Sequence, residues 1–111
     1  MNPDSLRQLV ACCRRPAFRG IGWPHKWVPH RVELPDFSGV YFTDPGAWDL
    51  IANRLAAGDQ YELITLDKPL GATALTMSIP IYQNRPNLYV KLEIISVNKV
   101  LGRSFHVSDF K

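Results

Sequence analysis

Hydrophobic and polar residues alternate along the second half of the chain. From residue 61 onward, hydrophobic positions recur at every second residue, which is typical of half-buried β-strands. Four segments of this kind are separated by short turns, at 61–66, 75–82, 88–95 and 99–107. Because such short turns connect antiparallel neighbours, the pattern predicts an antiparallel meander of three to four strands.

Two helices are expected before these strands. The first covers about residues 4–14, where apolar side chains recur at helical spacing. The second covers residues 45–57, after a capping Thr43 or Asp44, and Gly58 supplies its left-handed stop. The expected fold class is therefore α+β, with two N-terminal helices packed on a three- to four-stranded antiparallel sheet.

The segment between the two helices is rich in proline, glycine and aromatic residues. Its prolines and glycines predict an irregular conformation over residues 16–39, and its aromatic residues predict an ordered arm that wraps on the body. One stretch, Trp23–His30, combines aromatic and basic residues and suits either base stacking or closure of the core edge, with the second favoured. We therefore expect one domain over 1–111, made of a helix and Pro/Trp-rich arm (1–39) and a helix and meander (40–111).

Composition and charge indicate the compartment in which the protein is expected and the kind of partner it is expected to bind. The net charge is +3, and the basic excess lies in the first third of the chain, which favours an anionic partner. Cys12 and Cys13 are adjacent, which excludes a disulfide framework and fits a reducing compartment. No apolar run approaches the length of a membrane span, so a cytoplasmic protein without a membrane partner is expected. The histidines have no carboxylate or thiol at ligand spacing, so neither a metal nor another cofactor is expected.

Alternation also predicts which side chains share the polar face of the sheet. Leu101, Phe105 and Val107 are expected to face the core, with Arg103 on the same side. The opposite face is expected to carry Tyr82, Tyr89, Lys91, Glu93, Ser104 and His106, with Gln83 and Arg85 at the adjoining turn. In the simplest interpretation this is an ordinary solvent-exposed face of an antiparallel sheet.

The same residues suit cleavage of RNA through its 2′-hydroxyl group. His106 suits proton transfer in either direction, and Glu93 is the alternative base. The cationic side chains of Lys91, Arg85 and Arg103 would stabilise the negative charge that grows on the phosphoryl oxygens. Tyr82 and Tyr89 would stack on unpaired bases.

The segments "IYQNRPNLYVKLEI" and "VLGRSFHVSDF" resemble the C-terminal part of the MqsR-type toxins within the RelE-like superfamily of bacterial mRNA interferases. The matching positions are Tyr82, Gln83, Arg85, Pro86, Tyr89, Lys91, Ser104, Phe105 and His106. The resemblance implies a small α+β, metal-independent ribonuclease that cuts mRNA, with or without the ribosome, and that a cognate antitoxin neutralises. It places Gln83, Tyr89 and His106 in the site and matches Lys68 to a further catalytic lysine. At His106 the chain departs from the family, whose members carry lysine there.

Two alternatives to an mRNA-cutting toxin remain open from the sequence. One is a non-enzymatic binding module, either immunity- or antitoxin-like or a small RNA-binding domain. The other is a tRNA-cutting nuclease of the colicin type. Growth arrest on expression separates the toxins from the binding module, and the identity of the cut RNA separates the two nucleases.

Overall fold

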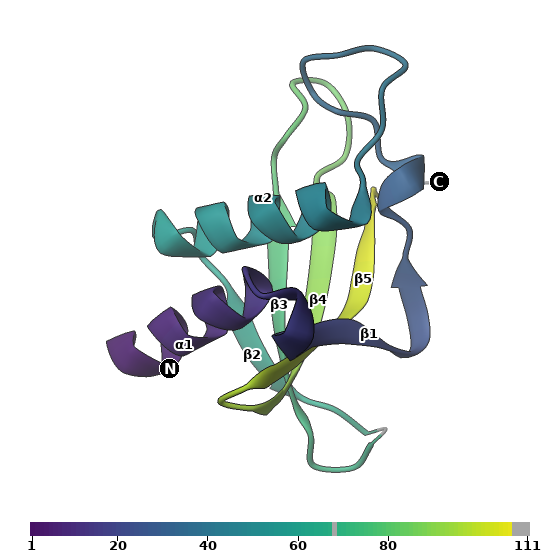
Figure 1. The fold of residues 1–111 in the computed structure, drawn as a ribbon. Helices are drawn as coiled ribbons and strands as arrows, with labels where there is room; N and C mark the ends of the chain where they lie inside the picture. The colour runs from purple at the N-terminus through teal and green to yellow at the C-terminus, as the bar shows by residue number, and fades with distance from the viewer. Residues whose placement is uncertain (68, 108–111) are drawn as a thin grey trace.

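The structure is a computed structural model that describes residues 1–67 and 69–107, with the backbone alone at 23–25. A five-stranded mixed sheet packs against two helices that lie side by side on one of its faces (Figure 1). The strand order is β1-β5-β4-β3-β2, in which β1 runs parallel to β5 and all other neighbours are antiparallel. In chain order the elements are α1 (Pro3–Cys13), β1 (Arg19–Trp27), α2 (Asp44–Ala56), β2 (Glu62–Thr65), β3 (Thr73–Ile79), β4 (Leu88–Ser96) and β5 (Lys99–Val107).

Both predicted helices are confirmed, and each has a side-chain cap. Asn2 Oδ1 accepts a hydrogen bond from the Ser5 backbone N–H at 2.8 Å, and Thr43 Oγ1 accepts one from that of Gly46 at 3.0 Å. Gly58, at φ +92°, follows α2 in the left-handed region. None of the described helices has the length and hydropathy needed to span a membrane.

The predicted order of helices and strands is only partly correct. The fold is α+β, but the helices are not both N-terminal to the sheet, because β1 lies between them. The segment 16–39 was expected to be irregular, yet Arg19–Trp27 pairs with β5 from Arg19 opposite Val100 to Trp27 opposite Phe105. This pairing is interrupted between Ile21 and Lys26, where Pro24 lies in the sequence. The sheet is consequently mixed rather than purely antiparallel.

Large apolar side chains fill the layer between the helices and the sheet. The ring of Trp27 lies 4.7 Å from that of Trp48 and 5.5 Å from that of Phe105, measured between centroids. Phe42 meets Phe105 edge-on at 5.3 Å. Trp27, from the stretch favoured to close the core edge, and Trp48 are both at most 4% exposed. The side chains of Trp23 and His25, from the same aromatic-basic stretch, lie outside the described residues.

A β-bulge in β5 changes which side chains face the core. Lys91 of β4 pairs with Ser104, whereas the next residue, Leu92, pairs with Gly102, so Arg103 is an extra residue in β5. Phe105 and Val107 contact the core as predicted. The prediction that Leu101 and Arg103 face the core is wrong, because the extra residue reverses the alternation before it. Leu101 instead pairs with Glu93 on the opposite face of the sheet.

Gly102 lies directly beneath the core tryptophan. A β-carbon at this position would lie 2.6 Å from Cε3 of Trp27, whose ring is held between its aromatic neighbours. Gly102→Ala is therefore expected to lower the free energy of unfolding by about 1–3 kcal/mol, measured by urea denaturation.

Gly20→Ala is the matched control for Gly102→Ala. A β-carbon at Gly20 would lie no closer than 3.3 Å to another atom, the flexible end of Leu101. This variant is expected to stay within about 1 kcal/mol of the wild type. Equal stability of the two variants would show that the Trp27 ring moves aside without cost.

Candidate functional site

The face of the sheet opposite the helices carries two rows of polar side chains. Pairing between β3, β4 and β5 aligns Ser78, Tyr89 and His106 in one row. The neighbouring row crosses all five strands and contains Glu62, Thr76, Lys91, Ser104 and Lys26. Four of the predicted site residues, Tyr89, Lys91, Ser104 and His106, are thereby brought together. We call these four residues the sheet-face cluster.

The rings of Tyr89 and His106 are in contact within the sheet-face cluster. Their centroids lie 5.6 Å apart at an interplanar angle of 53°, and both side chains are half-buried. Burial raises the pKa of the Tyr89 phenol, and the nearby Glu62 carboxylate raises it further. Tyr89 therefore stays protonated at neutral pH and is a hydrogen-bond donor rather than a base.

Glu93 and Arg103 form a buried ion pair on the same face. Arg103 donates from Nη1 to Glu93 Oε1 at 2.6 Å, and the two side chains are only 8% and 5% exposed, respectively. A β-carbon at Gly22 would lie 2.5 Å from Cδ of Arg103, so the β1 backbone packs closely against the stem of this side chain. Glu93 lies on the predicted face, but its carboxylate is occupied by Arg103 and does not face solvent.

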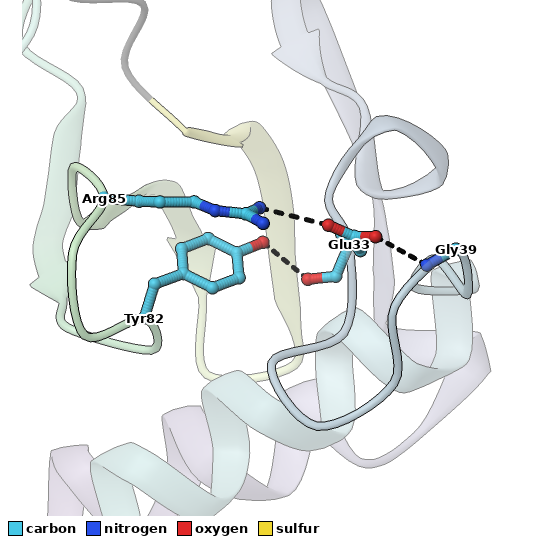
Figure 2. A network of polar contacts seen from close by, with 4 residues as sticks. All are labelled: Glu33, Gly39, Tyr82 and Arg85. Carbon is cyan, nitrogen blue, oxygen red and sulfur yellow. Dashed lines mark hydrogen bonds and ion pairs between the residues drawn. The ribbon is translucent and has the colours of Figure 1, made fainter.

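Tyr82 and Arg85 belong to a second site, formed by the β3–β4 loop and the hairpin at 32–42 (Figure 2). Arg85 Nη1 donates to Glu33 Oε1 at 3.1 Å, and the Tyr82 hydroxyl donates to the Glu33 carbonyl oxygen at 2.5 Å. The backbone N–H of Gly39 donates to Glu33 Oε2 at 2.5 Å. The Arg85 guanidinium also lies 4.8 Å above the centre of the Tyr82 ring. Glu33 thus holds the two loops together, and we call this network the loop clamp.

A pocket of about 510 Å³ lies at the loop clamp, and Gln83 lines it together with Tyr82 and Arg85. The predicted site residues that the structure describes are therefore divided among the sheet-face cluster, the Glu93–Arg103 ion pair, and the loop clamp with its pocket. Lys68 lies outside the described residues. Sequence reasoning missed Glu33, whose partners Tyr82 and Arg85 lie about 50 residues further along the chain. No local pattern marks a contact of this kind.

Outside these two sites, the described chain contains two cysteines and no group of side chains able to bind a metal ion. Cys13 is fully buried, and burial raises the pKa of its thiol to about 12, which leaves it unreactive. The Cys12 thiol donates to the carbonyl oxygen of Val97. Among residues 1–67 and 69–107, no three His, Cys, Asp or Glu side chains form a group able to hold a metal ion.

Comparison with known proteins identifies no relative. No protein-family model matches the sequence, and neither the curated proteins nor the solved structures contain a significant match.

Glu33→Gln is expected to destabilise the protein at neutral pH but not in acid. Hydrogen bonds from Gly39 and Arg85 lower the pKa of Glu33 below its ordinary value of 4.5. A lowered pKa stabilises the fold above the unfolded-state value, and this contribution is lost as the pH falls through the folded-state value. Thermal unfolding should therefore separate the variant from the wild type at pH 7, and the difference should shrink as the pH is lowered from 4.5 toward 3.

Asp36→Asn is the control for Glu33→Gln, because Asp36 lines the same pocket but takes no part in the loop clamp. It should leave the pH dependence of unfolding unchanged. An equal loss of stability for Glu33→Gln at both pH values would contradict an ionic role for Glu33.

Proposed function

We propose that this protein is the toxin of a bacterial toxin–antitoxin pair and cleaves mRNA without a metal ion through the 2′-hydroxyl group. The observation that supports this most is the contact of Tyr89 with His106 beside Lys91, on the sheet face that the helices leave uncovered. An imidazole next to an ammonium and a neutral phenol supplies a proton carrier, a positive charge and a hydrogen-bond donor.

In this mechanism the neutral imidazole of His106 takes the proton of the 2′-hydroxyl. The 2′-oxygen forms a bond to phosphorus, and the bond between phosphorus and the 5′-oxygen breaks. The protonated imidazole then returns its proton to the 5′-oxygen, which leaves a 2′,3′-cyclic phosphate and a free 5′-hydroxyl. Lys91 stabilises the charge that grows on the phosphoryl oxygens, and Tyr89 orients the nucleotide.

The other predicted residues would support this reaction without transferring a proton. Arg103 and Glu93 fix the shape of β5 beside Lys91 and Ser104, since their pairing occupies both side chains. Gln83, Arg85 and Tyr82 extend the binding surface at the loop clamp, where the RNA chain would continue. A cognate antitoxin would cover one or both of these surfaces.

The direct test is incubation of the purified protein with a 5′-labelled mRNA fragment in the presence of EDTA. We expect discrete products that end in a 2′,3′-cyclic phosphate or a 3′-phosphate. A short pulse of expression in bacteria should arrest growth and create new mRNA ends. Cleavage confined to tRNA would instead identify a colicin-type nuclease.

The second candidate function is a binding module without catalysis, and the ion pair between Glu93 and Arg103 favours it. Because Arg103 occupies that carboxylate, His106 is the one residue of the sheet-face cluster suited to proton transfer at neutral pH. In this case the face binds RNA or a protein and leaves it intact. Harmless expression, together with RNA binding and no new ends, would establish this alternative.

A further inference from the structure

A groove between α1 and α2 is unused by the proposed function. It has a volume of about 520 Å³ and is lined only by residues of the two helices and their ends. Its floor is apolar, formed by Leu6, Val10, Ala11, Leu55 and Ala56. The two helices lie on the face of the sheet opposite the sheet-face cluster (Figure 1). The groove is lined only by residues of these helices and their ends, so it is on that side of the molecule.

Three arginines of α1 and its C-terminal end surround this floor. Arg7 is paired with Asp4 in the first turn of the helix. Arg14 donates to Asn53 Oδ1 of α2 at 3.1 Å, and the Arg15 guanidinium lies 5.5 Å from the centre of the Phe18 ring. Within the part of the chain that the structure describes, no carboxylate lies within 4.0 Å of Arg14 or Arg15. Two positive charges beside an apolar floor are therefore uncompensated by described residues.

We propose that this groove binds an acidic amphipathic helix of a partner protein. Aliphatic side chains on one face of such a helix would cover the apolar floor, and flanking carboxylates would meet Arg14 and Arg15. An extended strand fits less well, because the groove lies between two helices and offers no sheet edge for backbone pairing. Single-stranded RNA fits less well too, because none of the lining residues is aromatic and bases stack on aromatic rings.

The partner helix would leave the sheet-face cluster open, because it docks on the other side of the molecule. The inference therefore does not depend on RNA cleavage. It assigns this protein a second surface, through which a partner is held while the polar sheet face remains free.

The test uses a fluorescent synthetic helical peptide of about 18 residues, or five turns, with leucines on one face and glutamates beside them. A peptide of the same composition but with scrambled leucines is the matched control. Fluorescence anisotropy should show binding of the amphipathic peptide alone. The double variant Arg14→Glu/Arg15→Glu should weaken that binding roughly tenfold, since two charge pairs become repulsive.

Two further variants separate the groove from general charge and from misfolding. Ala11→Glu places a carboxylate on the groove floor at an exposed helical position and should also weaken binding of the peptide. Arg31→Glu reverses one positive charge, against two in the double variant and one added negative charge in Ala11→Glu, at an exposed residue outside the groove and should leave the affinity unchanged. Circular dichroism of each variant checks that the fold is retained.

Three results would overturn the inference. Equal binding of the scrambled peptide would show that charge alone is recognised. If Arg31→Glu lowered the affinity for the peptide as much as the groove variants do, this too would show that charge alone is recognised. If a single-stranded RNA oligonucleotide displaces the peptide, and Arg14→Glu/Arg15→Glu weakens RNA binding more than Lys91→Glu does, the groove is an RNA surface instead.

Discussion

His106→Ala is expected to lower the rate of RNA cleavage by about 10²- to 10⁴-fold while the protein remains folded. The imidazole is the proton carrier of the proposed mechanism and its contact with Tyr89 fixes its orientation. Its side chain is only half-buried at the end of β5, so its removal leaves no large cavity. The measurement is single-turnover cleavage of a labelled mRNA fragment, with circular dichroism to confirm the fold.

His30→Ala is the matched control for His106→Ala. His30 is exposed in the short 3₁₀ turn Pro29–Arg31, outside both polar rows of the sheet. Its removal should leave the cleavage rate unchanged. Undiminished cleavage by His106→Ala would assign proton transfer to another residue.

Glu93→Leu alone is expected to lower the free energy of unfolding by about 3–5 kcal/mol, because it leaves the charge of Arg103 buried without a partner. Arg103→Met alone should have a comparable effect, because it leaves the carboxylate of Glu93 buried without a partner. The double variant Glu93→Leu/Arg103→Met removes both charges and is expected to lie much closer to the wild type. Urea denaturation of the four proteins measures the coupling between the two sites.

The double variant also tests the role of Glu93 in the chemistry. If it folds and still cuts RNA, proton transfer belongs to His106 and the ion pair serves the shape of β5. If it folds but no longer cuts RNA, Glu93 takes part directly, as the sequence alone suggested. Single variants that each cost less than about 1 kcal/mol and add independently would show that the pair is open to water.

Local patterns predicted most of the elements but not the way in which they are joined. The helix α2 follows from its own caps, Thr43 and Gly58, and β4 follows from strict alternation. The strand β1 has no such pattern, because its glycines and its proline disfavour a strand and its pairing depends on β5, far along the chain. Tertiary context thus decided this element, which propensity alone assigns to a loop.

The candidate site could be predicted from the sequence where side chains alternate regularly between the two faces of β4 and β5. Tyr89, Lys91, Ser104 and His106 share a face because the pairing of β4 and β5 is regular from Leu88 to Lys91. Beyond that point the bulge at Arg103 reverses the alternation, and no residue type in β5 indicates a bulge in advance. The clamp at Glu33 was missed because it connects two loops, where no hydrophobic period exists to follow.

The parallel pairing of β1 with β5 also sets the order in which the protein assembles during synthesis. Trp27 and Phe105 are about 80 residues apart, so β1 waits several seconds for its partner at ribosomal rates of about 5–20 residues per second. Until β5 has been made, the aromatic core lacks Phe105 and β1 has no strand beside it. Ser104 and His106 arrive on this same strand. The proposed proton carrier, His106, is therefore added together with the strand that completes the sheet, so the proposed chemistry would be unavailable to the nascent chain before it is able to fold.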